Sequence, residues 1–128
     1  MKTRFSMTLA FLAGVAVCAV AVQGLHAAAR PPVYVVTEVD TTDLQAYEKD
    51  YVPLVQASIK ASGGRLVAAG QNAVSLEGSP PAQRVAINEF DGLAAVLAWR
   101  ASAQYKEARK VGDKYGKFRS FAIQGIAQ

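Results

Sequence analysis

The stretch Arg84–Arg109, RVAINEFDGLAAVLAWRASAQYKEAR, decides the fold of this chain. Its first part, through Phe90, combines β-branched and aromatic residues and predicts a strand. Asp91-Gly92 follows as a break, and the apolar segment that ends at Trp99 predicts a helix. Ser102 is placed to cap a second, short helix. A strand followed by two short helices is therefore the unit around which the other elements are arranged.

A strand and a helix are expected before this unit. Val33–Val39 is a β-branched run that is apolar on both faces except at Glu38. Thr42–Gln45 matches a capping box and predicts the start of a helix. Apolar residues then recur at steps of three and four, while Pro53 is expected to kink that helix or restart it. Gly63-Gly64 is expected to end it, because glycine reaches the left-handed conformation at little cost.

The remaining segments complete a β-α-β-β-α-β order. Arg65–Ala69 predicts the second strand, and Phe118–Ile126 predicts the last one. Two right-handed crossovers in this order give a ferredoxin-like α+β fold, a four-stranded antiparallel sheet with both helices on one face. The strands are apolar on the other face too, which would leave a large exposed patch on a monomer. We therefore expect a homodimer in which a second copy covers that face.

The N-terminus predicts secretion. Lys2 and Arg4 precede a predominantly apolar run from Phe5 to Val22, and Ala27–Ala29 offers the small residues that a signal peptidase accepts. We interpret residues 1–29 as a signal peptide, residues 30–128 as a single domain, and the protein as periplasmic or secreted. The alternative is an uncleaved membrane anchor, but the Ala- and Gly-rich run favours cleavage, without stable membrane insertion afterwards.

Composition then excludes several functions. The chain has a formal charge of +4, and loss of Lys2 and Arg4 would leave a mildly basic domain, which does not favour nucleic-acid binding. Cys18 and His26 are the only cysteine and histidine, and both lie in the predicted signal peptide. The mature chain could then have no Ser-His-Asp triad, no cysteine nucleophile and no His/Cys zinc site. We expect no metal and no cofactor.

The order and spacing of many short motifs resemble the family catalogued as domain of unknown function 1330. The resemblance covers nearly all of the predicted mature chain, and the motifs that carry it are Glu38-Val39, Asp43, Tyr47, Gly63-Gly64-Arg65, Leu76-Glu77-Gly78, Arg84-Val85, Glu89-Phe90, Ala98-Trp99, Ser102 and Tyr105. It implies the dimeric α+β barrel superfamily, which includes small monooxygenases, muconolactone isomerases and haem-dependent enzymes. It implies no particular reaction. The chain departs from the family pattern at Arg100, where an aromatic residue is common, and at Gln104, where an acidic one is.

The predicted ligand-binding residues are Arg84, Trp99, Ser102, Tyr105 and Arg109. Trp99 is either an aromatic wall of a pocket or a core anchor between helix and sheet. Tyr105 and Arg109 are four residues apart and share a helix face, where they could hold an anionic or carbonyl-bearing ligand. The alternative for this pair is a solvated helix end with an arginine stacked on a ring.

Two carboxylates are candidates for catalysis. Glu77 precedes a glycine in a polar, proline-rich loop, and Glu89 lies at the far end of the strand that Arg84 begins. Either could transfer a proton if burial raised its pKa. The simpler interpretation is a turn-stabilising carboxylate and a strand-end ion pair.

Two functions remain open from the sequence. The first is a small-ligand-binding barrel that acts, as an enzyme without a cofactor, on a small aromatic or carbonyl compound. The second is a non-enzymatic dimeric interaction module of the cell envelope. An enclosed pocket beside Trp99 would favour the first, and full packing around it the second.

Overall fold

The computed structural model describes residues 30–128, so the predicted signal peptide lies outside the described residues. The elements, in order, are β1 Val33–Thr41, α1 Leu44–Ala46, the π-helix η1 Tyr47–Tyr51, α2 Val52–Ala61, β2 Arg65–Gly70, β3 Arg84–Phe90, α3 Leu93–Ala101, α4 Ala103–Gly112 and β4 Gly116–Gln124. Within these residues, no helix is long and apolar enough to cross a membrane.

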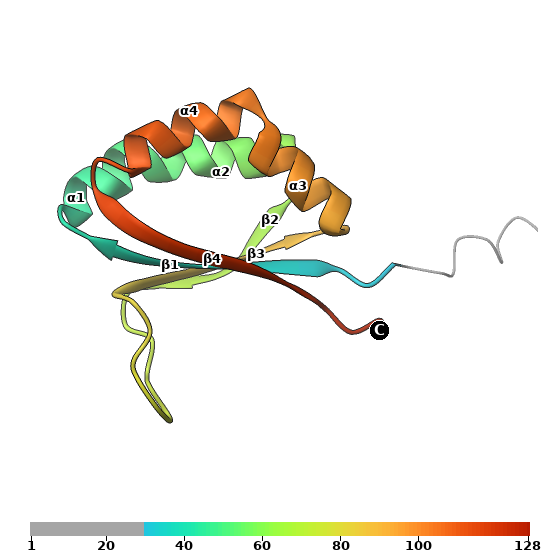
Figure 1. Ribbon diagram of the computed structural model, residues 1–128, viewed down its shortest axis with the longest axis horizontal. Coiled ribbons are helices and arrows are strands. Elements are labelled where there is room, and N and C mark those ends of the chain that lie inside the picture. Colours follow the sequence, from blue (N-terminus) through green and yellow to red (C-terminus); the bar gives the residue numbers. More distant parts are fainter. Residues whose placement is uncertain (1–29) are drawn as a thin grey trace, which may run out of the picture.

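The four strands form one antiparallel sheet in the order β2-β3-β1-β4. The helices lie together on one face of it, as Figure 1 shows. This is the ferredoxin-like α+β architecture that the sequence predicts. The last strand differs in extent from the prediction, because its pairing with β1 already begins at Gly116, opposite Thr41.

The first helical segment begins one residue later than the capping box suggests. Asp43, rather than Thr42, is the N-cap, and its Oδ1 accepts a 3.0 Å hydrogen bond from the Ala46 amide. The Thr42 hydroxyl instead donates to the Tyr115 carbonyl oxygen at 3.2 Å. This contact ties the start of the helix to the residues just before β4.

A π-helical turn, η1, joins α1 to α2 and turns both Tyr47 and Tyr51 into the core. Pro53 then lies in the first turn of α2, where its missing N–H needs no partner. Pro53 was expected either to kink the helix or to restart it, and the structure shows the second outcome. A wider π turn shifts the side chains that follow it, and such turns are frequent at functional sites.

The two glycines after α2 have different roles. Gly63 has a φ of +78° and closes the helix in the left-handed conformation that the sequence predicts. At Gly64 there is no room for a side chain, because a Cβ there would lie 2.6 Å from Phe90 Cε1 and 2.9 Å from Ile59 Cγ2. Both neighbours are buried, so neither can move away freely. Gly64 thus allows the α2–β2 connection to pack directly on the core.

The helices α3 and α4 differ in how they begin. Gly92, and not Asp91, is the N-cap of α3, and it makes no side-chain capping hydrogen bond. Ser102 does cap α4, as predicted, since its Oγ accepts from the Tyr105 amide at 3.2 Å. The same hydroxyl donates to the Trp99 carbonyl oxygen at 2.7 Å. Ser102 therefore fixes the turn between the two helices.

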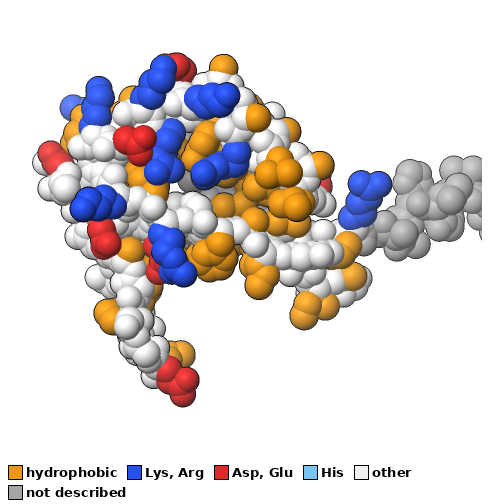
Figure 2. Space-filling model, in the orientation of Figure 1, with side chains coloured by type: hydrophobic (Ala, Val, Ile, Leu, Met, Phe, Trp, Pro, Cys, Tyr) orange, Lys and Arg blue, Asp and Glu red, His pale blue; other side chains and the backbone are white. Residues whose placement is uncertain are grey.

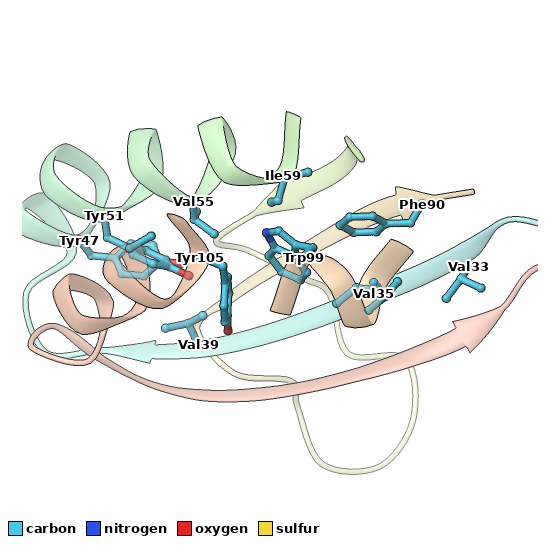
Figure 3. Packing of buried hydrophobic residues seen from close by; sticks show 12 residues of the cluster. Val33, Val35, Val39, Tyr47, Tyr51, Val55, Ile59, Phe90, Trp99 and Tyr105 are labelled. Carbon is cyan, nitrogen blue, oxygen red and sulfur yellow. The ribbon is translucent and has the colours of Figure 1, made fainter. Parts of the chain in front are cut away.

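The core lies between the sheet and the helices, and Figure 3 shows its side chains filling that layer. Alternate β1 residues, among them Val33, Val35 and Val39, point into it.

The outer face of the sheet, which points away from the helices, carries the intervening apolar residues of three strands. These are Tyr34, Val36, Val85, Ile87, Phe121 and Ile123. Phe121 and Ile123 are 45% and 57% exposed, so no element of residues 30–128 covers this part of the face.

We expect Gly64→Ala to destabilise the protein by about 1–3 kcal/mol, because the added methyl group overpacks the core between Phe90 and Ile59. Gly70→Ala is the matched control, since a Cβ there would meet nothing within 4 Å. Urea unfolding measures both effects. Equal stabilities of the two variants would contradict this account of Gly64.

Candidate functional site

A cavity of about 100 Å³ lies between the helical layer and the sheet and is partly open to solvent. Its sheet floor and its helical walls come from distant parts of the chain. The lining residues are Thr37, Tyr47, Tyr51, Val52, Val55, Gln56, Ile59, Leu66, Ala69, Arg84, Ala86, Asn88, Trp99, Arg100, Tyr105, Arg109, Phe118 and Ser120. Aromatic and aliphatic side chains dominate this list, as in most sites for small organic ligands.

Trp99 is both a core anchor and a cavity wall. Its side chain is buried, and its Nε1–H donates a 2.9 Å hydrogen bond to Ser58 Oγ on α2. The Ser58 hydroxyl in turn donates to the Val55 carbonyl oxygen at 2.7 Å. The Tyr105 ring packs edge-on against the indole, with 4.6 Å between centroids. The indole is therefore held rigidly, with its polar atom satisfied.

Two arginines of the cavity are held by carboxylates that do not line it. Arg84 donates to Glu48 Oε1 at 2.9 Å. Arg109 donates to Asp113 Oδ1 at 2.6 Å and to the Tyr105 hydroxyl at 3.3 Å, and its guanidinium lies 3.8 Å from the Phe118 ring centroid. Burial lowers the pKa of Arg109, but its hydrogen bonds to these two partners outweigh that effect and raise it overall.

Arg100 contributes a third guanidinium. It lies 4.7 Å from the centroid of the Tyr105 ring and 5.9 Å from that of Trp99. These distances are typical of cation–π contacts. The cavity is thus bordered by three cations, and Figure 2 shows Lys and Arg side chains gathered around a hollow below the helices.

The tyrosines of η1 are protonated at neutral pH. Burial raises the pKa of the Tyr51 phenol well above its ordinary value near 10, with smaller contributions from Tyr47 and Tyr105. Burial also raises the pKa of Tyr47, although the neighbouring Arg84 opposes this shift. These phenols can therefore donate hydrogen bonds in the cavity, but they are poor general bases.

Asn88 is the unsatisfied polar group of the cavity. It lies on the helix-facing side of β3, it is 4% exposed, and its Oδ1 has no hydrogen-bond partner within residues 30–128. Leaving a buried acceptor unpaired costs about 1–3 kcal/mol. Two further polar groups of the floor, the hydroxyls of Thr37 and Ser120, lie 3.1 Å apart and bond to each other.

The structure brings together four of the predicted ligand-binding residues. Arg84, Trp99, Tyr105 and Arg109 all line the cavity, although they come from β3, α3 and α4. Ser102 does not line it, since its hydroxyl is engaged in the turn before α4. Its contribution is to position Trp99 and Tyr105.

The two candidate catalytic carboxylates are not part of this site. Glu77 lies exposed in the loop between β2 and β3, which Figure 1 shows projecting away from the helices. Glu89 lies on the outer face of β3 and pairs with Arg65 at 2.9 Å. Within residues 30–128, no carboxylate lines the cavity. Strand alternation explains the position of Glu89, because its neighbours Asn88 and Phe90 occupy the helix-facing side.

Four functional candidates were not found from the sequence: Tyr47, Tyr51, Asn88 and Arg100. Asn88 did give a signal, since it shares a strand face with Phe90 and a polar residue at a core position is unusual. The tyrosines fit an ordinary core pattern, and Arg100 fits an ordinary exposed helix position. In addition, residues 30–128 contain no group of three or more His, Cys, Asp or Glu side chains that could hold a metal ion.

Fold and cavity together define a ferredoxin-like α+β protein with an aromatic, arginine-bordered cavity in its core layer. Residues 32–126 match the family described as "Domain of unknown function (DUF1330)". The chain belongs to this family, as its sequence motifs suggest. No curated protein matches it.

Several solved structures share the fold at low sequence identity. A protein of unknown function from Rhodopseudomonas palustris is 20% identical, with a TM-score of 0.56 over 85% of this chain and 93% of that chain. SnoaB, a cofactor-independent oxygenase from Streptomyces nogalater, is 11% identical, with a TM-score of 0.58 over 77% and 96%. HapK from Hahella chejuensis is 13% identical, with a TM-score of 0.57 over 75% and 94%.

The raised pKa of Tyr51 predicts a loss of stability in alkali. Below pH 10 the phenol is protonated in both folded and unfolded chains, whereas above it the unfolded chain releases the proton first. Stability should therefore fall by about 1 kcal/mol for each pH unit above 10 on account of this group. Urea unfolding of Tyr51→Phe should show a shallower alkaline decline, and parallel pH profiles would contradict the prediction.

Proposed function

We propose that this protein binds a small, planar aromatic or carbonyl compound in the cavity between its helices and its sheet. One observation carries the proposal: the buried, unpaired Oδ1 of Asn88 in the cavity floor. A protein that only needed a stable core would gain by replacing such a group with an apolar one. A ligand that donates a hydrogen bond to Asn88 would remove the penalty when it binds.

The shape of the cavity supports a planar ligand. Trp99, Tyr47, Tyr51, Tyr105 and Phe118 present rings along its walls. Its volume of about 100 Å³ is somewhat below the roughly 150 Å³ of a closed cavity that holds benzene. The enclosed space therefore suits a small carbonyl compound or part of a single ring, and the rest of a ring-containing ligand would extend through the opening.

Turnover without a cofactor is compatible with this fold, because SnoaB is described as a cofactor-independent oxygenase. In our chain the polar groups available to a bound compound include phenols, guanidinium groups, two side-chain amides and hydroxyls. They can orient a ligand and stabilise negative charge that develops on it. We therefore propose ligand binding as the main function. If the bound compound loses a proton because it is acidic, water is the acceptor.

We also propose that the protein acts as a secreted homodimer. The outer sheet face carries apolar side chains from β1, β3 and β4, and Figure 2 shows hydrophobic side chains along the side of the sheet that lies away from the helices. A second copy would bury this face around a twofold axis. Residues 1–29 have the charge, apolar run and small residues of a cleaved signal, which would deliver the protein to the periplasm or beyond.

We expect Asn88→Leu to weaken binding of para-hydroxybenzamide, a neutral planar probe, at least about tenfold, while stability stays unchanged or rises. Trp99 is the only tryptophan, so the chemical shift of its single indole N–H signal in an NMR titration reports occupancy of the cavity. Asn72→Leu, in the exposed loop before β3, is the matched control. Failure of the probe to bind the wild-type protein would favour the interaction module instead.

We expect Ile123→Glu to convert the dimer to a monomer, because the new carboxylate would be buried without a partner in the interface. Leu97→Glu is the control, since Leu97 is similarly exposed, at 60%, but lies on α3. Sedimentation velocity measures the outcome. A wild-type monomer would remove the homodimer from the proposal without affecting the cavity.

A further inference from the structure

We propose that the cavity selects a monoanionic planar ligand, a small carboxylate, and that Arg100 is the residue that selects its charge. The inference rests on the function proposed above, since it concerns the same cavity. It goes beyond that function by assigning the chemical class of the ligand and a specificity residue that the sequence motifs did not indicate.

The first argument is the balance of charge around the cavity. Three guanidinium groups line it, those of Arg84, Arg100 and Arg109. Glu48 compensates Arg84 and Asp113 compensates Arg109, both from outside the lining. Among the residues that the structure describes, the third charge, that of Arg100, has no compensating carboxylate. A ligand with a single negative charge would complete the balance, whereas a dianion would exceed it.

The second argument is that the Arg100 guanidinium is held in place while its N–H groups have no partner in the described part of the chain. Within residues 30–128 its guanidinium forms no ion pair and no side-chain hydrogen bond. It is nevertheless held in place, because its Cζ lies over the Tyr105 ring and within cation–π distance of Trp99. These cation–π contacts use none of its N–H groups in a hydrogen bond, so these groups are free to bind a carboxylate through two parallel hydrogen bonds.

The third argument is the unpaired amide oxygen of Asn88 in the cavity floor, which needs a hydrogen-bond donor on the same ligand. Asn88 is 4% exposed and lacks a partner for its Oδ1, so it would accept from a hydroxyl of the bound molecule. Most of the other lining residues are aromatic or aliphatic. An aromatic ring with a carboxylate and a hydroxyl therefore satisfies Arg100, the rings and Asn88 together.

Two probes of nearly the same shape test the charge preference. para-Hydroxybenzoate and para-hydroxybenzamide differ by one negative charge, and both are titrated against the purified protein while the Trp99 indole signal is followed. We expect the carboxylate to bind at least about tenfold more tightly than the amide, since a hydrogen bond to a charged group is the stronger one. Added salt should reduce the preference, because Arg100 is exposed.

Substitution of one charge identifies the residue responsible. Arg100→Gln should lower affinity for the carboxylate about tenfold or more and leave affinity for the amide nearly unchanged. Lys106→Gln is the matched control, because it removes one positive charge from exposed α4 surface outside the cavity. It should keep the preference, and Arg100→Lys should restore part of it without the paired hydrogen bonds.

The outcomes separate the two proposals. Equal affinity for both probes, or a preference that Arg100→Gln leaves intact, would overturn the assignment of Arg100 and preserve the ligand-binding function. Binding of neither probe would overturn both proposals. A preference lost in Arg100→Gln and kept in Lys106→Gln would establish Arg100 as the specificity residue.

Discussion

The hydrogen bond from the Trp99 indole to Ser58 is the contact on which the site depends. Both side chains are buried, and the bond joins the end of α3 to the middle of α2. It satisfies the one polar atom of the indole, so the large ring can remain in an apolar layer. With the two helices fixed in this way, Tyr105 is placed against the ring by the turn at Ser102. The cavity is the space that this rigid arrangement leaves above the sheet.

Stability and binding make opposite demands on that layer. Gly64 lets a loop pack tightly on Phe90, and Val39 is almost completely buried, as a well-packed core requires. Near the cavity the same layer contains an unpaired amide and three guanidinium groups. Such departures from an apolar core lower stability, and they are characteristic of functional sites. The contrast between the two regions is the physical reason for proposing a ligand at one of them.

Much of the fold followed from local signals. The strand and helix order, the restart at Pro53, the left-handed Gly63 and the cap at Ser102 each depend on a few neighbouring residues. The helix starts were less accurate. Thr42 was expected to cap the first helix, but its hydroxyl is used by Tyr115, far along the chain. A competing contact of this kind cannot be seen in a local motif.

The sequence by itself determined the α+β order through its periodicity, and the order of its short motifs indicated the family. It also singled out four residues that line the cavity, Arg84, Trp99, Tyr105 and Arg109, of which the last two share a helix face through their i,i+4 spacing. Tertiary structure decided which polar groups meet. Strand pairing turned Asn88 inward and Glu89 outward, and the long loop carried Glu77 away from the helices. The π turn brought two tyrosines to the same cavity as Arg100. Such convergence depends on sheet register and helix packing, which join residues that no short motif contains.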